Sequence, residues 1–430
     1  MKRFEARRVA IVGGVRIPFC RANTAYADLG NLEMMTAALK ALVGRFSLAG
    51  ERIGDVALGA VIKHSSDWNL AREAVLNTEL APETPAFGIQ RACGTSLDAA
   101  ILIANKIAMG QIDVGIAGGV DTISDVPIVY TRRFGWRIKQ MTRARTFGNK
   151  LRALKGFRLK ELKPSFPDVG EPRTGLSMGE HTELMAKQWG IKREDQDKFA
   201  YESHRKATRA YQDGFYADLV HEFNGAAQDN ILRSDTTLEK LANLKPAFDK
   251  SGSGTLTAGN STPLSDGASC ALLCSEQWAQ AKGLPIQANL VHSKVAAVEF
   301  TKEEGLLMAP AYAVSELLRD AGLALQDFDF YEIHEAFAAQ VLCTLQAWES
   351  VNFCKNRLGR DAAMGAIDPD KLNVVGSSLA LGHPFAATGT RVLATLAKLL
   401  AQRGHGRGLI SVCTAGGMGV AAILERPRDA

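Results

Sequence analysis

Cys93 lies where a cysteine side chain could become reactive. Its surroundings read QRACGTS, between an apolar segment and a run whose apolar residues recur at helical spacing, so we expect a helix to begin just after it. The first N–H groups of a helix lack intrahelical partners and carry partial positive charge, and both effects favour a thiolate. A thiolate is the nucleophilic form of cysteine. From position alone a second interpretation stays open, because free cysteine is often a small buried hydrophobe.

The C-terminal part of the chain repeats the order of elements around Cys93. In the first half the cysteine turn precedes an expected helix, a glycine, a strand and a Gly-Gly pair. In the second half a turn with His383 precedes a helix, glycines, a strand and then Cys413 before another Gly-Gly pair. We therefore expect two related α/β halves, whose pseudo-twofold pairing would bring their equivalent turns together.

Four side chains at such turns could share one reaction. A cysteine nucleophile such as Cys93 needs a base within hydrogen-bonding reach, and His383 can serve. Oxyanions formed during acyl transfer need donors, which His334 and His383 could supply. Cys413 suits proton transfer to carbon, because the pKa of a thiol can be tuned near neutrality. Each residue alone also fits a structural role at a strand end or helix start, but the four together favour a site.

Strands that alternate with helices predict an α/β layered fold with a largely parallel sheet. We expect strands at residues 9–12, 55–62, 114–119, 271–274, 291–298, 328–333 and 408–412, and helices at 32–46, 68–76, 97–109, 177–189, 194–211, 311–321, 338–348 and 392–400. The alternation stops between residues 125 and 252, where polar, surface-type helices are expected instead. The predicted domains are residues 1–124 with 253–286, an insert at 125–252, and residues 287–430.

The insert contains a basic amphipathic segment, residues 131–164. It has twelve Lys and Arg residues and a single acid, Glu161, with apolar and aromatic residues interleaved. Such a segment suits a membrane surface, a partner protein or a polyanionic ligand. The alternative is that this segment is only a solvent-exposed part of the surface.

Composition places the chain among ordinary globular proteins. Of 430 residues 46% are hydrophobic and 23% charged, with a net charge of +5. No apolar run is long enough to span a membrane, the basic N-terminus leads directly into a strand rather than a signal sequence, and the C-terminus matches no targeting address. Seven scattered cysteines show no metal-ligand spacing, so we predict no metal and a reducing, cytoplasmic location.

The ordered motifs resemble the thiolase family over essentially the whole chain. They are RACGTS at 91–96, AGG at 117–119, SMGE at 177–180, TAGN at 257–260, DGA at 266–268, HEAF at 334–337, GHP at 382–384 and CTAGG at 413–417. The resemblance implies a thiolase-like α/β fold, with two similar αβ core domains in a five-layer αβαβα arrangement and an inserted loop domain.

The resemblance also implies a role for each residue at the turns. Cys93 would become acylated, His383 would activate it, and Cys413 would exchange the carbon-bound proton. His383, with a water held by His334, would form one oxyanion hole, and the backbone N–H groups of Cys93 and Ala415 would form the other.

Substrate contacts follow from the same resemblance. Ser261 and Thr262 would contact CoA, while Met178 and Phe337 would line the pocket. CoA would be a substrate, and no tightly bound cofactor is implied.

Two residues depart from the common family pattern. Many thiolases have Asn where this chain has His334, and the His form is typical of β-subunits of fatty-acid-oxidation complexes. Ala415 stands where many relatives have Gly, so its N–H can act only if alanine fits the turn.

The implied assembly is a homodimer core, extended to a tetramer or to a hetero-oligomer with a hydratase/dehydrogenase subunit. Peripheral membrane contact through residues 131–164 is also implied, and no nucleic-acid-binding signature is present.

The implied activity is cleavage of 3-ketoacyl-CoA by CoA, through an acyl-cysteine, to acetyl-CoA and a shortened acyl-CoA in fatty acid β-oxidation. We expect medium or long acyl chains. One alternative is an acetyl-CoA acetyltransferase that makes acetoacetyl-CoA, and another is a decarboxylating ketosynthase, which Cys413 argues against. A non-catalytic CoA- or lipid-binding scaffold is the alternative of another class, and Cys93, His383 and Cys413 argue against it.

Overall fold

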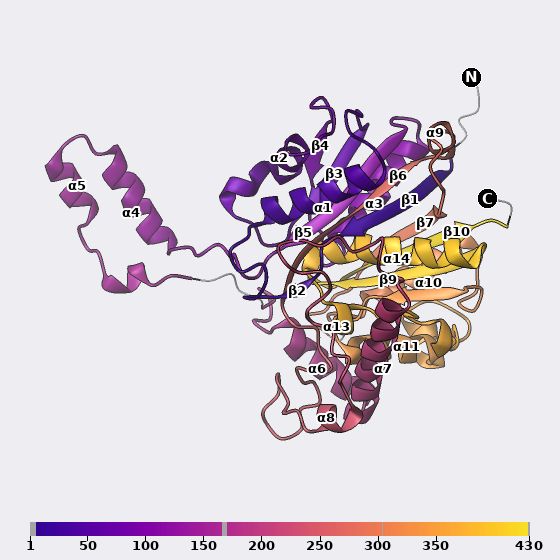
Figure 1. The fold of residues 1–430 in the computed structure, drawn as a ribbon. Coiled ribbons are helices and arrows are strands. Elements are labelled where there is room, and N and C mark those ends of the chain that lie inside the picture. The colour runs from indigo at the N-terminus through magenta and orange to yellow at the C-terminus, as the bar shows by residue number, and fades with distance from the viewer. Residues whose placement is uncertain (1–5, 166–169, 303, 429–430) are drawn as a thin grey trace.

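The structure is a computed structural model that describes residues 6–165, 170–302 and 304–428 (Figure 1). The start of the basic N-terminus, through residue 5, and the last two residues of the C-terminus lie outside the described part. Within the described residues, no helix combines the length and the apolar character needed to cross a membrane.

One mixed sheet forms the framework of the molecule. Its strand order is β4-β3-β5-β6-β1-β7-β10-β9-β8, and β2 pairs with β6 beside this path. The strands are β1 (Val9–Arg16), β2 (Cys20–Arg21), β3 (Asp55–Gly59), β4 (Ala86–Gly88), β5 (Val114–Asp121), β6 (Ser265–Ser275), β7 (Ala288–Ala297), β8 (Phe330–Ile333), β9 (Gly406–Thr414) and β10 (Met418–Arg426).

The sheet consists of two halves with the same internal pattern. Strands β3 and β5 are parallel, as are β8 and β9, and the pairs β5–β6 and β9–β10 are both antiparallel. Strand β6 then pairs antiparallel with β1, as β10 does with β7. The halves meet where β1 and β7 pair over Ala10↔Asn289 and Ile11↔Ala288. This repetition agrees with the repeat seen in the sequence.

The expected largely parallel sheet was wrong. Only the outer pairs β3–β4, β3–β5 and β8–β9 are parallel among the described strands. Strands β9 and β10 are joined by a tight turn in which Gly416 and Gly417 have φ of 79° and 70°. A tight turn joins antiparallel neighbours, whereas parallel strands need a long crossover.

Helices and sheet halves alternate in five layers. Helices α3 (Thr95–Ala108) and α14 (Thr388–Arg403) pack on each other in the middle, with strands of both halves around them. Helices α1 (Asn31–Arg45) and α2 (Leu70–Leu76) cover the outer face of the first half. Helices α10 (Ala309–Ala321) and α11 (Ala338–Glu349) cover that of the second half. Three apolar clusters fill the spaces between these layers and hold the central helices in place.

The chain leaves the sheet after β5 and returns at β6, which pairs with β5. This path is what an insert at residues 125–252 requires, and we propose those bounds for it. Its helices are α4 (Arg132–Arg143), α5 (Phe147–Ala153), α6 (Met178–Trp189), α7 (Arg193–Gln212) and α8 (Leu238–Ala242). Figure 1 shows α4 and α5 standing far from the body of the molecule. We call residues 131–164 the arm.

Helices α6 and α7 are less superficial than their polar sequences predicted. Helix α6 packs on α11 and buries Met185 and Ala186, while α7 packs on α11 and on α13 (Ser378–Leu381). The remaining short helices are α9 (Glu276–Ala281) and α12 (Val351–Asn356), and a 3₁₀ turn at Ser65–Asn69 precedes α2. The insert therefore supports the second half of the molecule from outside.

Candidate active site

The Cys93 turn lies directly before α3 and against the second half. Ala92 has a φ of 42°, and the hydroxyl of Thr95 donates to the carbonyl oxygen of Ala92 at 2.6 Å. A Cβ atom at Gly94 would lie 2.8 Å from a methyl carbon of Val420 on β10. Glycine at 94 therefore lets the cysteine turn approach the other half of the sheet.

The Cys93 thiol is protonated at rest, which corrects the expected thiolate. Burial raises the pKa of Cys93 to about 12, although the backbone N–H groups of Ala415 and of Cys93 itself act to lower it. The free energy needed to remove a thiolate from water exceeds the stabilisation that the helix start and these N–H groups give to it. The sulfur therefore needs a base before it can attack.

Two buried histidines converge on this sulfur. His334 follows β8, and His383 lies between α13 and α14. The Cys93 sulfur and one ring nitrogen of each histidine all lie within 4.8 Å of one another. The ring centroids of His334 and His383 are 4.1 Å apart. The structure thus brings together three of the four side chains that the sequence selected.

Both imidazoles are neutral. Burial, and then the nearby Arg391 cation, lower the pKa of His383 to about 3. Burial, and then His383 and Arg391, hold the pKa of His334 well below its ordinary value. A neutral imidazole can accept a proton. The Nδ1 of His383 lies 2.5 Å from the hydroxyl of Thr388, so an Nδ1–H donor there would leave Nε2 free to act as a base.

Cys413 lies at the end of β9 and is buried. Burial, and then interaction with Cys93, raise the pKa of Cys413 well above its ordinary value. The two cysteines are therefore close enough to interact electrostatically, as the expected two-cysteine site needs.

Alanine fits the turn after Cys413. The left-handed residues there are Gly416 and Gly417, and Ala415 is not among the residues with positive φ. The N–H of Ala415 also points to the Cys93 sulfur, where it lowers the thiol pKa. The departure at Ala415 from the common Gly does not distort the backbone.

A cavity of about 690 Å³ contains two of the predicted substrate contacts, Ser261 and Thr262. The N–H and the hydroxyl of Thr262 donate to the carbonyl oxygen of Ala336 at 3.0 and 3.1 Å, which ties the cavity wall to the turn after His334. Three cations, Arg21, Arg233 and Lys240, also line it. Sequence analysis missed them because they are far apart in the chain and belong to no motif.

Met178 and Phe337 do not line that cavity. They lie instead in or against the apolar cluster that also contains Cys413. Phe337 makes an edge contact with Phe248, whose ring does line the cavity, at 5.9 Å between centroids. Phe337 therefore lies behind the cavity wall, and Met178 packs against the same apolar cluster.

Asp121, at the end of β5, was also missed as a site residue. Its carboxylate accepts hydrogen bonds from the N–H groups of Val61 and Ile62 and, at 2.7 Å, from that of Ala386. Burial raises the pKa of Asp121 to about 7. An acid at the strand end, two residues after the Gly118-Gly119 pair, was the available signal, and its hydrogen bond from Ala386 holds the loop after His383 against the first half.

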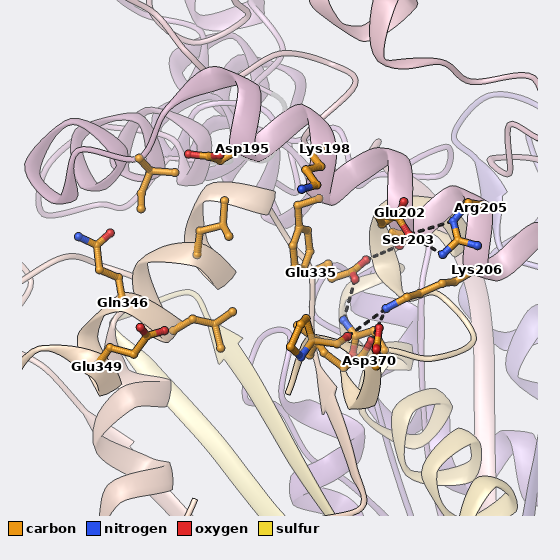
Figure 2. A pocket seen from close by; sticks show the side chains of 17 residues that line it. Asp195, Lys198, Glu202, Ser203, Arg205, Lys206, Glu335, Gln346, Glu349 and Asp370 are labelled. Carbon is orange, nitrogen blue, oxygen red and sulfur yellow. Dashed lines mark hydrogen bonds and ion pairs between the residues drawn. The ribbon is translucent and has the colours of Figure 1, made fainter. Parts of the chain in front are cut away.

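A second cavity, of about 580 Å³, lies between α7 and α11 (Figure 2). Its lining includes neither cysteine of the site nor either histidine. Glu335, the residue after His334, accepts hydrogen bonds there from Ser203 and from Asn373, each at 2.6 Å (Figure 2). This cavity therefore lies behind the histidine turn, while the reactive groups lie elsewhere.

The same reactive atoms could also hold a metal ion. Among the described residues, one group of His, Cys, Asp and Glu side chains is compact enough for this, and it consists of Cys93, His334 and His383. Three protein donors match the number in a catalytic zinc site, whereas a closed structural zinc site uses four. A sulfur beside two neutral imidazoles is also a complete nucleophile–base arrangement. The same three atoms can therefore serve acyl transfer, which is the use that we propose for them below.

Comparison with known proteins gives consistent matches over the chain. The family models described as "Thiolase, N-terminal domain" and "Thiolase, C-terminal domain" match residues 9–277 and 284–426. The 3-ketoacyl-CoA thiolase of Pectobacterium atrosepticum is 41% identical over 97% of this chain and 96% of its own. That of Shewanella baltica is 41% identical over 98% and 97%.

Two solved structures superpose on this fold with TM-scores of 0.81. The acetyl-CoA acetyltransferase of Bacillus anthracis is 30% identical and covers 98% of this chain and 99% of its own. The human mitochondrial 3-ketoacyl-CoA thiolase is 28% identical and covers 97% and 99%.

Proposed function

The chain belongs to the thiolase family, and we propose on this basis that it cleaves 3-ketoacyl-CoA with CoA in fatty acid β-oxidation. It is an acyltransferase whose products are acetyl-CoA and an acyl-CoA shortened by two carbons. The observation that carries the proposal is the convergence of the Cys93 sulfur and two neutral imidazoles at the contact between the halves. The 41% identity to proteins named 3-ketoacyl-CoA thiolase supports the same substrate class.

In the first half-reaction, neutral His383 takes the proton of Cys93, and the sulfur attacks the 3-keto carbon. The bond between C2 and C3 then breaks, which leaves an acyl thioester on Cys93 and the enolate of acetyl-CoA. His383 and a water held by His334 stabilise the enolate oxygen, while the N–H groups of Cys93 and Ala415 stabilise the oxyanion at C3. Cys413 gives its proton to the enolate carbon, and acetyl-CoA leaves.

In the second half-reaction, a free CoA takes the acyl group. The Cys413 thiolate accepts the proton of the CoA thiol, and the CoA sulfur attacks the acyl carbon on Cys93. As the Cys93 sulfur leaves, it recovers its proton from His383. Every group of the site thus returns to its starting state.

The cavity that contains Ser261 and Thr262 is the proposed CoA site. Its cations Arg21, Arg233 and Lys240 suit the phosphates of CoA, because guanidinium and ammonium groups bind phosphate oxygens. Met178 and Phe337 remain our proposed wall for the acyl chain.

A thiolysis assay across 3-ketoacyl-CoA substrates from four to sixteen carbons tests the function. A thiolase of β-oxidation should cleave the longer chains, whereas an acetyl-CoA acetyltransferase should turn over only the shortest substrate. A non-catalytic scaffold would cleave none. With free CoA left out, mass spectrometry should find the acyl group on a Cys93 peptide, and an acyl group found only elsewhere would refute the nucleophile.

We also propose that the arm docks on an anionic membrane surface. Eleven of its twelve Lys and Arg side chains are exposed, and so are Trp136, Phe147 and Leu159, at 58%, 76% and 80%. Cations beside exposed aromatic and aliphatic side chains suit the interface of an anionic bilayer. The twelfth cation, Arg137, is buried and donates to Glu161 at 2.8 Å, so this pair folds the arm.

Vesicle co-sedimentation tests this docking. The protein should sediment with vesicles that contain phosphatidylserine, more weakly with phosphatidylcholine alone, and less in high salt. Replacement of Trp136 and Phe147 by Ser should reduce binding without loss of thiolysis in solution. Binding that is equal on both lipids, or that survives in the double variant, would refute a membrane surface and leave a protein partner as the occupant.

For the assembly we propose a homodimer core, extended to a tetramer or to a hetero-oligomer with a hydratase/dehydrogenase subunit. One edge of β4 is unpaired among the described strands, and exposed Leu102 and Met109 line an apolar hollow beside Phe87. Light scattering should give at least twice the mass of the chain, and a monomer would refute the proposal.

We also propose a cytoplasmic location. All seven cysteines are free, which supports a reducing compartment.

A further inference from the structure

We propose that Ser378 and Arg391 are positioning residues that fix His334 as a donor of an Nε2–H hydrogen bond toward the reacting oxygen. This inference rests on the proposed thiolysis and adds two residues to it. Ser378 begins α13, and Arg391 lies within α14. Neither residue is part of the Cys93, His334 and His383 group itself.

The contacts form a short buried chain. The hydroxyl oxygen of Ser378 lies 2.8 Å from Nδ1 of His334 and accepts a hydrogen bond from Nη2 of Arg391 at 2.6 Å. All three residues are at most 3% exposed. The chain therefore runs from the guanidinium, through one hydroxyl, to the far side of the His334 ring from the reaction.

The donors and acceptors of this chain fix the protonation of the ring. A guanidinium can only donate, so Ser378 is the acceptor in its contact with Arg391. The Ser378 hydroxyl hydrogen then has one acceptor among the contacts of this side chain, Nδ1 of His334. A buried hydroxyl hydrogen without an acceptor is unfavourable, so Nδ1 accepts and the ring hydrogen lies on Nε2.

Nε2 of His334 is buried and has no hydrogen-bond partner among the described residues. Its ring lies against that of His383, at the Cys93 sulfur. An Nε2–H at this place can donate to a substrate oxygen, directly or through a water.

Arg391 is itself held in place from two sides. Its Nη1 donates to Ser377 at 3.1 Å and lies 3.9 Å from the carboxylate of Glu332 on β8. Glu332 is two residues before His334, so the cation links α14 to the strand that carries the histidine.

The neighbouring histidine has no such cation behind its hydroxyl partner. The hydroxyl of Thr388 faces Nδ1 of His383, and no donor to that hydroxyl is present among the described residues. The Thr388 hydroxyl can therefore accept as well as donate, and the base role proposed for His383 requires that it accept an Nδ1–H. Opposite tautomers would thus give adjacent rings different tasks, with His383 taking the Cys93 proton and His334 donating to the oxygen.

Adjacent serines supply a matched pair of variants. Arg391 donates to both, but only Ser378 contacts His334. Ser378→Ala should lower kcat about 10- to 100-fold with KM within about threefold, as when an orienting partner or oxyanion donor is lost. Ser377→Ala should stay within about twofold of the wild type, and Ser378→Thr, which keeps the hydroxyl, should recover most of the activity. Thermal unfolding of each variant checks the fold.

Nitrogen NMR of the histidine-labelled enzyme reads the tautomer directly. In the wild type, His334 should show an unprotonated Nδ1 and a protonated Nε2, and Ser378→Ala should populate the other tautomer. Equal kinetics of the two alanine variants, or an Nδ1–H on His334 in the wild type, would overturn the inference. A wild type without thiolysis would instead refute the proposed function, while the NMR result would still decide the tautomer.

Discussion

At the scale of single residues, the resting site carries no charge on its reactive groups. Burial keeps the Cys93 thiol protonated and both imidazoles neutral, so charge appears only when a proton moves between them. A thiolate in an open cleft would react with any electrophile. In the proposed mechanism the sulfur becomes a nucleophile only after its proton has moved to His383.

The lowered pKa of His383 predicts a pH dependence of stability. The folded value is about 3 and the ordinary value 6.5, so between these pH values the unfolded chain binds more protons than the folded one. The free energy of unfolding should therefore fall as the pH drops from 6.5 toward 4, by at most about 1.4 kcal/mol per pH unit for this group. Denaturant unfolding of His383→Gln should show a shallower fall than the wild type. The same substitution at exposed His292 should not change the slope, and equal slopes for all three proteins would contradict the prediction.

Cys413 and Cys343 allow the proton-transfer role to be separated from packing. Both are buried free cysteines of the same apolar cluster, but only Cys413 interacts with Cys93. Cys413→Ala should lose thiolysis about 10²- to 10⁴-fold, while a simple acyl thioester still acylates Cys93. Cys343→Ala should keep its activity per folded molecule. Wild-type thiolysis in Cys413→Ala would remove this cysteine from the mechanism.

At the scale of elements, the close approach of α3 and α14 positions the site. A Cβ at Gly389 would lie 2.2 Å from the backbone nitrogen of Leu97, whereas one at Gly44 in α1 would meet nothing within 4 Å. Gly389→Ala should therefore destabilise the protein by about 1–3 kcal/mol, because backbone must move. Gly44→Ala should be neutral or stabilise by up to about 1 kcal/mol. Thermal unfolding measures the stability of both variants. Equal effects would show that α3 and α14 can move apart without loss of stability.

The elements themselves could largely be predicted from the sequence, since apolar periodicity reports which face of a helix or strand is buried. The direction of the strands could not, because periodicity does not say whether β9 and β10 are joined by a tight turn. Asp121 shows the same limit within the site. It holds the N–H of Ala386, 265 residues further along the chain, and no local pattern encodes that contact. The grouping of Cys93, His383 and Cys413 could be predicted because each stands in a motif at a turn, and their catalytic roles stay a prediction.

At the scale of the whole molecule, the arm is a small folded unit attached to a separate body. Arg137 donates to Glu161 and to the carbonyl oxygens of Ala153, Lys155 and Gly156. The Arg137 hydrogen bond, above all, holds the pKa of Glu161 below its ordinary value. The sequence presented twelve similar cations, and only the fold distinguishes the one that is structural.

Arg137→Met should loosen the arm and leave the catalytic body intact. Vesicle binding should weaken, because the exposed side chains lose their common arrangement, while thiolysis in solution stays within about twofold of the wild type. Exposed Arg143 supplies the control, since Arg143→Met removes the same charge without the buried contacts. Equal vesicle binding by these two variants would mean that charge alone matters.

Because the arm lies between β5 and β6, the chain can be cut there into two fragments that each keep one part of the site. A cut in the arm, by brief trypsin treatment or by separate expression of the two pieces, leaves one fragment with Cys93 and another with His383 and Cys413. Each fragment then holds half of a reaction that neither can complete. Because β5 and β6 pair along their length, the fragments should reassemble, and recovered activity would report that two polypeptides have met.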